Sequence, residues 1–186
     1  MCFVAESLSE YNLDLLCITE TWLLPSDVAI VSAALPSSYS FHHIPRATNA
    51  RGGGVGLIFS KALSNLKVIP NSLNVSSFEF LEIEFSRFLQ NLKMVVIYRP
   101  GHPGTDRVFM DEFGCLLERL STCRATPVIC GDFNYWFDNP SMKPYSHEFI
   151  SLLDMNNMSN HVLGPTHISG HTLDLVLSPL GTELVK

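Results

Sequence analysis

The segment Pro127-Val128-Ile129-Cys130-Gly131-Asp132-Phe133-Asn134 indicates the architecture of this chain most clearly. Its short apolar run, bounded by Pro127 and Gly131, predicts a buried strand. Beyond that run, Asp132 and Asn134 lie two residues apart, so an extended backbone directs both side chains to the same side. A carboxylate and an amide are therefore delivered together at a strand end, where a layered fold presents its site.

Further apolar runs along the chain predict strands at residues 13–18, 54–59, 78–85, 94–98 and 172–178. The run at 94–98 is continuously apolar, which is typical of a strand buried on both faces. The run at 78–85 alternates instead. This alternation predicts a half-exposed strand, with Leu81 and Ile83 inward and Glu82 and Glu84 on the other face.

Helical spacing of apolar residues predicts three helices. The clearest covers residues 106–123, another covers residues 1–11 with Leu8 and Tyr11 on one side, and a third begins near Ser146. Because predicted strands and helices alternate along the chain, we expect a layered α/β or α+β domain in which helices cover the sheets.

Length and composition set the broad class of protein. The 186 residues correspond to one domain, and an apolar fraction of 46% with 16% charged residues excludes disorder over the bulk of the chain. No apolar run is long enough to span a membrane, and no secretory signal is visible. The five cysteines are odd in number and show no CxxC spacing. We therefore expect a reduced, intracellular chain without a membrane partner.

The net charge of −6 is unevenly distributed. Between Asp27 and Glu79 the chain has no acidic residue, and this basic segment contains Arg46, Arg51, Lys61 and Lys67. Such a run is usually a solvated face. A net-negative protein that binds nucleic acid would nevertheless need a local cluster of this kind, because phosphate affinity comes from Lys and Arg.

Polar residues also stand at the ends of other predicted strands. Glu20 follows the run at 13–18, Tyr98 ends the run at 94–98, and Asp174 interrupts the apolar run at 172–178. Taken singly, a turn cap explains Asp132, and strand ends explain Glu20 and Tyr98. Asp174 is harder to explain, because a carboxylate among leucines costs several kcal/mol unless it is paired or solvated. Their joint occurrence favours a functional site.

Five motifs occur in order along the chain: Leu15-Leu16-Cys17-Ile18-Thr19-Glu20-Thr21-Trp22, Gly52-Gly53-Gly54-Val55-Gly56-Leu57, Val96-Ile97-Tyr98-Arg99-Pro100, Gly131-Asp132-Phe133-Asn134 and, as the fifth, Pro165-Thr166-His167-Ile168 with His171-Thr172-Leu173-Asp174-Leu175-Val176-Leu177. Together they resemble the endonuclease/exonuclease/phosphatase superfamily. The resemblance is greatest to the apurinic-type endonuclease domain of non-LTR (LINE-type) retrotransposons. It implies a DNase I-like, four-layered α/β sandwich that hydrolyses phosphodiesters with Mg²⁺ or Mn²⁺.

The resemblance also implies a role for each matching residue. Glu20 matches the metal ligand, and a hard oxygen ligand is what Mg²⁺ prefers. Asp132 matches the carboxylate that activates or orients the attacking water. Asn134 is expected to hold that water or the phosphate, and Tyr98 to donate to the phosphate or to the charge that develops during the reaction. Asp174 matches the carboxylate that orients the family's catalytic histidine.

Three residues are expected at the substrate. Thr166 matches a position close to it in the family, and Arg46 and Arg51 belong to the basic segment. The resemblance implies DNA as the substrate, a reverse transcriptase region on the same polypeptide, and a nuclear location that gives access to DNA.

Two parts of the family pattern are expected to be missing from this sequence. Relatives begin with a strand that carries an Asn near the metal, and they end with a Ser-Asp-His segment whose His sits against the phosphate. Residues 1–186 are therefore expected to form a partial domain that lacks both. Losing one member of a catalytic set often costs nearly as much rate as losing all, which lowers the activity expected of this chain.

Two alternatives to the endonuclease stay open at this point. One is a non-catalytic remnant or co-opted interaction module, which the missing segments and the acidic remainder of the chain favour. The other is a phosphomonoesterase or phospholipid phosphatase with the same core, which the residues around Trp22 and at 170–177 disfavour.

Overall fold

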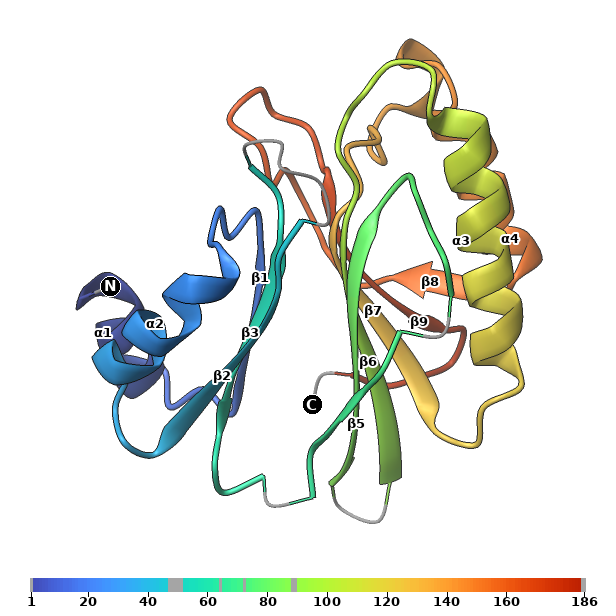
Figure 1. Ribbon diagram of the computed structural model, residues 1–186. Coiled ribbons are helices and arrows are strands. Elements are labelled where there is room, and N and C mark those ends of the chain that lie inside the picture. The colour runs from blue at the N-terminus through green and yellow to red at the C-terminus, as the bar shows by residue number, and fades with distance from the viewer. Residues whose placement is uncertain (1, 47–51, 64, 72, 88–89, 185–186) are drawn as a thin grey trace.

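The computed structural model describes residues 2–46, 52–63, 65–71, 73–87 and 90–184. Within them two β-sheets pack against each other, with helices on the outer side of each sheet (Figure 1). The resulting order of helices, sheet, sheet and helices confirms the four-layered α/β sandwich. None of the described helices is long and apolar enough to cross a membrane.

The smaller sheet has three described strands in the order β1-β3-β2, all antiparallel. They are β1 (Leu15–Thr19), β2 (Tyr39–Ile44) and β3 (Val55–Ser60). Helices α1 (Cys2–Glu10) and α2 (Val28–Ala34) cover its outer face (Figure 1), and a 3-10 helix at Pro25–Asp27 precedes α2.

Leu8 of α1, Leu35 after α2 and Ile58 of β3 form the core between this sheet and its helices. The helix predicted at residues 1–11 ends at Glu10, so Tyr11 is exposed and does not share the buried side with Leu8. Strand β1 is only partly buried along its length. It was predicted to be buried, but it lies at the edge of the described sheet and not at its centre.

The larger sheet has the order β4-β5-β6-β7-β9-β8. Its strands are β4 (Lys67–Ile69), β5 (Glu79–Arg87), β6 (Gln90–Tyr98), β7 (Thr126–Asp132), β8 (Met158–Asn160) and β9 (Asp174–Pro179). Only β6 and β7 pair in parallel among the described strands. A parallel pair needs a long crossover connection, and helix α3 (Asp106–Ser121) supplies it.

Helix α4 (Ser146–Met155), preceded by a 3-10 helix at Pro140–Met142, lies beside α3 on the outer face of this sheet (Figure 1). The core under both helices is rich in aromatic rings. Phe109 and Phe113 of α3 stack with centroids 5.3 Å apart, and Phe149 of α4 contacts Phe109, Phe113, Phe133 and Tyr135. A separate apolar core between the two sheets contains Leu57 of β3 and Leu81 of β5.

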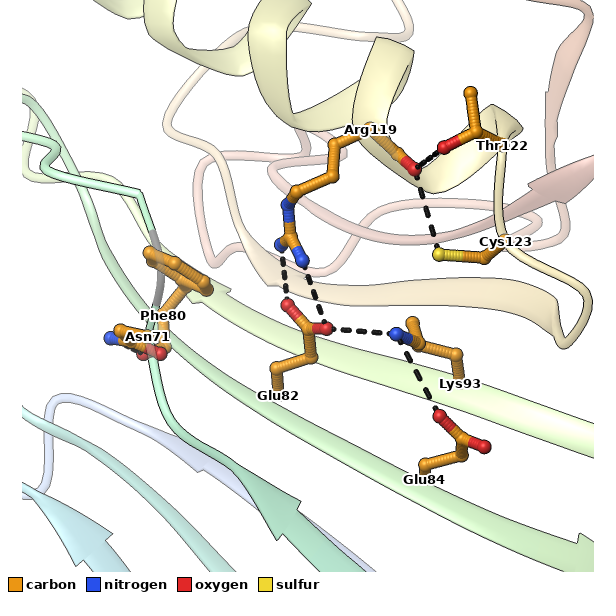
Figure 2. A network of polar contacts seen from close by, with 8 residues as sticks. All are labelled: Asn71, Phe80, Glu82, Glu84, Lys93, Arg119, Thr122 and Cys123. Atoms are coloured by element: carbon orange, nitrogen blue, oxygen red, sulfur yellow. Dashed lines mark hydrogen bonds and ion pairs between the residues drawn. The ribbon is translucent and has the colours of Figure 1, made fainter.

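The alternating strand at 78–85 was predicted to be half-exposed, and this prediction is wrong at Glu82, although Glu84 on the same face is partly exposed. Leu81 and Ile83 face the small sheet, and Glu82 points to the opposite face with only 1% of its surface exposed. The reason is that α3 covers that face and brings Arg119 to it. Figure 2 shows Arg119 donating to both oxygens of Glu82, while Lys93 Nζ donates to Glu82 Oε1 at 3.1 Å.

This ion-pair network ties the last turn of α3 to β5 and β6. Glu84 extends it with Oε2 at 3.7 Å from Lys93 Nζ, but its side chain is 42% exposed. Desolvation of Glu82 is outweighed by its hydrogen bonds to Arg119 and Lys93, so the pKa of its carboxyl lies below the ordinary value.

The backbone at Gly131 allows β7 to approach β6. Gly131 has a φ of +143°, and a Cβ placed on it would lie 1.8 Å from the carbonyl oxygen of Ile97, its register partner in β6. A side chain is therefore excluded at Gly131 by the neighbouring backbone and not by a movable side chain.

We expect Glu82→Gln to lower the free energy of unfolding by about 3–5 kcal/mol at pH 7, because Arg119 and Lys93 lose their buried counter-charge. Glu84→Gln is the control, with an expected loss below about 1 kcal/mol because its ion pair is exposed. Urea unfolding measures both. The stabilisation by Glu82 is present above its unfolded-state pKa and is lost as pH falls through its lowered folded-state pKa. The gap between wild type and Glu82→Gln should therefore narrow in acid, and a constant gap would contradict this assignment.

We expect Gly131→Ala to cost about 3 kcal/mol or more, because β6 and β7 must separate to admit the methyl group. Gly114→Ala is the matched control: in α3 its new Cβ would lie 3.9 Å from Leu152 Cδ1, an ordinary contact. Alanine favours the helix by about 0.5–1 kcal/mol over glycine, so this control should be neutral or stabilising. Equal thermal unfolding midpoints for the two variants would rule out the backbone clash.

Candidate active site

Strand pairing brings three of the predicted site residues into one row. Tyr98 at the end of β6 is paired with Asp132 at the end of β7, and Asp132 is paired with Asp174 at the start of β9. Register partners lie on the same face of a sheet, with neighbouring strands about 4.8 Å apart. Because Tyr98 belongs to the core between the sheets, the whole row faces the small sheet.

Glu20 reaches this row from the small sheet. It directly follows β1, has a φ of +51°, and accepts a hydrogen bond from the Tyr98 hydroxyl at Oε1. Trp22 Nε1 donates to Glu20 Oε2 at 3.4 Å. One acidic end of the sandwich therefore contains Glu20, Tyr98, Asp132 and Asp174, as the sequence predicts.

Asn134 is fixed against Asp132. Its backbone N–H donates to Asp132 Oδ1 at 3.0 Å, and its Nδ2 donates to Asp132 Oδ2 at 3.1 Å and to the carbonyl of Arg99 at 2.8 Å. Because Nδ2 is used by the protein, the side-chain oxygen is the group that Asn134 can offer to another molecule. An acceptor suits a water molecule better than a phosphate oxygen, which narrows the expected role of Asn134.

The strand ends are held by a buried arginine. Arg99 is 2% exposed, donates from Nη2 to Asp106 Oδ1 at 2.8 Å and from Nη1 to the Phe133 carbonyl at 3.3 Å, and lies 4.0 Å from the Tyr135 ring centroid. Asp106 is the first residue of α3, so this ion pair joins the helix start to the segment that carries Asp132 and Asn134.

Burial raises the pKa of Asp132 to about 6, and the negative charges of Asp174 and Glu20 add to the effect, while the hydrogen bonds from Asn134 oppose it. Since this value lies above the ordinary pKa of about 4, ionisation of Asp132 opposes folding as pH rises from about 4 through 6. Burial and the hydrogen bond to Glu20 raise the pKa of Tyr98 as well, so its phenol stays protonated at neutral pH.

The predicted substrate contacts lie in different settings. Thr166 is exposed, and its hydroxyl oxygen accepts the N–H groups of Leu173 and Asp174, each at 3.0 Å, so it borders the row. Arg46 lies 5.7 Å from the Tyr98 ring centroid and pairs through Nε with Glu79 Oε1 at 2.5 Å. Arg51 lies outside the described residues.

The basic segment does not form one patch in the described part of the chain. Arg46 lies near the end of β3 that begins at Val55, whereas Lys61 follows the other end, about 20 Å away along the strand. Lys61 donates to the carbonyl of Ser37 at 2.8 Å on that far side. The described residues of this segment therefore form no continuous phosphate-binding surface, although Arg46 borders the site.

A second cluster beside the row was not predicted. The Trp136 and His171 rings stack with centroids 3.6 Å apart, His171 Nδ1 pairs with Asp138 Oδ2 at 2.9 Å, and Lys143 Nζ lies 5.8 Å from the Trp136 ring centroid and donates to the Asn134 carbonyl. The only sequence signal for it is the aromatic pair Tyr135-Trp136 directly after Asn134. The residues meet only because β7 and β9 are paired.

The acidic end of the sandwich is also a candidate metal site. The described residues contain no group of three or more His, Cys, Asp or Glu side chains arranged to hold a metal ion. Mg²⁺ does not require one, since it usually keeps several waters and binds through one or two carboxylates together with substrate phosphates. The donor chemistry therefore fits, because Glu20 supplies carboxylate oxygens and the side chains of Asp132 and Asp174 add negative charge beside it.

A cavity of about 380 Å³ lies at the opposite end of the large sheet, lined by residues that include Leu120, Cys123, Pro127 and Asn156. It adjoins the end of α3 and the start of β7, whereas the acidic row lies at the end of β7. The cavity contributes nothing to the acidic row.

Comparison with known proteins gives the family. Residues 1–185 match the model of the endonuclease/exonuclease/phosphatase family, while curated protein sequences give no match. Similar solved structures include the AP endonuclease LMAP from Leishmania major (TM-score 0.71, 15% identity, covering 95% of this chain and 72% of that one). The endonuclease domain of TRAS1, a telomere-specific non-LTR retrotransposon, is also similar (TM-score 0.69, 12% identity, 94% and 76% covered).

A phosphatase has the same fold: the mannosyl-6-phosphatase of Bacteroides thetaiotaomicron has a TM-score of 0.64 at 9% identity, with 95% of this chain and 75% of that one covered. At such identities the structural likeness establishes the fold alone. The family match covers nearly the whole chain and agrees with the ordered motifs and the four layers. The chain therefore belongs to the endonuclease/exonuclease/phosphatase family.

Proposed function

We propose that this chain is a divalent-metal-dependent DNA endonuclease of the kind that non-LTR retrotransposons encode. The observation that carries the proposal is the row Tyr98–Asp132–Asp174 facing Glu20, with Asn134 bonded to Asp132. The residues around Trp22 and at 170–177 favour a nuclease over a phosphatase, and the TRAS1 endonuclease domain and an AP endonuclease have the same fold.

Glu20 would hold the metal, with Mg²⁺ or Mn²⁺ as the candidates. Bound there, the cation would neutralise charge on a phosphodiester and on the carboxylates around it. The Tyr98 hydroxyl and the indole N–H of Trp22 each donate to one oxygen of Glu20, so the protein orients this carboxylate before a metal binds. Donation from Tyr98 to a phosphate would require exchange of its bond to Glu20, and it stays a prediction.

Asp132 would accept the proton of the attacking water. A carboxyl with a pKa of about 6 is a stronger base than an ordinary aspartate and is still ionised at neutral pH. The free oxygen of Asn134 lies beside it and would hold the same water. Asp174, next to Asp132 in the sheet, would contribute negative charge that raises the basicity of Asp132.

The proposed biological setting is taken from the resemblance to retrotransposon endonucleases. An endonuclease of this kind would act on DNA as part of a polypeptide with a reverse transcriptase region, and it would need access to the nucleus.

We expect the chain to nick supercoiled plasmid in Mg²⁺ and to lose this activity in chelator. Asp132→Ala should reduce nicking by about 10³-fold or more, because the water loses its proton acceptor. Asp154→Ala is the matched control, since Asp154 is exposed on α4, and it should nick like the wild type. Equal background from wild type and Asp132→Ala would favour the non-catalytic interaction module instead.

We expect Mg²⁺ to lower the pKa of Asp132 from about 6, because burial raises this pKa most but the negative charge of Glu20 adds to the rise, and a cation at Glu20 offsets that charge. The carboxyl-carbon chemical shift of Asp132, followed by NMR against pH, measures this. Glu20→Gln should lower the pKa by itself, since it removes one negative charge, and Mg²⁺ should then have little further effect. A pKa that is unchanged by Mg²⁺ in the wild type would contradict a metal at Glu20.

A further inference from the structure

The side chain of Trp22 is exposed at the edge of the acidic row. It lies two residues after Glu20, and 61% of its surface is accessible. Tryptophan is usually largely buried, because its ring gains more than most side chains from leaving water. Orienting Glu20 explains the indole N–H of Trp22, but it does not explain why the ring is exposed.

Several contacts fix the position of this exposed ring. The backbone N–H of Trp22 donates to the Gly53 carbonyl at 2.9 Å, and its indole N–H donates to Glu20 Oε2. Thr21, between them, bonds His43 Nε2 at 2.7 Å. A Cβ placed on Gly52 would lie 3.5 Å from the indole carbons, so one part of the ring rests on this glycine. Trp22 is therefore held in place in spite of its exposure.

The backbone conformation around Trp22 also indicates that its position is held by the protein. Glu20 and Trp22 have φ values of +51° and +56°, a region that non-glycine residues seldom adopt. Such conformations cost about 1–3 kcal/mol each, and they cluster at binding and catalytic sites. Here the two unusual residues turn a carboxylate and an indole out of the same strand end.

Trp136, the other tryptophan of the chain, provides a contrast. Its ring is stacked on His171 and lies near Lys143, so it is engaged within the protein. Among the described residues no aromatic ring stacks on Trp22. The acidic row therefore has one fixed indole with a face available to a ligand.

We propose that Trp22 stacks on a nucleobase of the DNA strand whose phosphate lies at Glu20 and Asp132. This rests on the proposed function and makes it more specific, because it assigns a base contact to a site otherwise described by its phosphate chemistry. Stacking suits this protein, since Arg46 at the site is already paired with Glu79 and electrostatic attraction to phosphates is correspondingly reduced. Base–aromatic stacking tolerates any sequence, because every base has a π-face.

Fluorescence of Trp22 tests base stacking without any cleavage. The variant Trp136→Phe leaves Trp22 as the only tryptophan and keeps a ring against His171. In this background, with Asp132→Ala to prevent cleavage, a single-stranded deoxyoligonucleotide of about 8 nucleotides should quench the emission. An oligomer of the same length built from abasic residues has the same phosphates and should quench far less.

Two outcomes of this titration would overturn the proposal. One is equal quenching by the abasic oligomer, which would assign the effect to phosphate. The other is equal quenching by a sugar phosphate such as glucose 6-phosphate, which would assign Trp22 to a sugar ring. Trp22→Phe with Trp136 intact is the control, and its emission should respond little to any of these probes.

Kinetics of plasmid nicking gives a second readout. Trp22→Ala should raise KM by roughly 5- to 150-fold with a smaller effect on kcat, the range expected from losing one stacked base. Trp22→Phe loses the N–H bond to Glu20 but keeps a stacking ring, so it should retain most of the affinity. Both variants should unfold at the wild-type temperature because the ring is exposed.

The two proposals can fail separately. If the wild type nicks DNA and Trp22→Ala shows an unchanged KM, base stacking is wrong and the endonuclease stands. If oligonucleotides quench Trp22 but the wild type nicks nothing, the endonuclease is wrong and the base contact stands.

Discussion

The parallel pairing of β6 with β7 is the constraint on which the rest of the structure depends. It requires the α3 crossover, and α3 in turn covers one face of the large sheet and builds the aromatic core there. The same pairing sets Tyr98 beside Asp132, so the acidic row is a product of strand register. Gly131 makes the pairing possible, because any side chain at that position would collide with the β6 backbone.

Sequence patterns predicted the elements that are apolar enough to stand out, such as the β3 run and the α3 helix. They missed β2, which contains two adjacent histidines, and β8, which has only three residues. Such strands form because a neighbouring strand, β3 or β9, supplies their hydrogen bonds. The periodicity of apolar residues in a sequence does not show this pairing. Glu82 was assigned to solvent for a similar reason: alternation shows which residues share a face, but not that a distant helix brings an arginine to cover it.

The site was predictable to the extent that it depends on ordered motifs. Glu20, Tyr98, Asp132 and Asp174 came from strand ends and family resemblance, and the sheet register brings them together. Their roles stay predictions. The stacked pair Trp136 and His171 could not be foreseen, because 35 positions separate them in the sequence and only the pairing of β7 with β9 joins them.

Helix α3 is fastened at both of its ends. Arg99 holds Asp106 at its start, and Glu82 holds Arg119 in its last turn. Because one ion pair holds each end, α3 resists both sliding along its axis and tilting relative to the large sheet. The geometry of the acidic row therefore depends on how firmly α3 is held against the two strands that it connects.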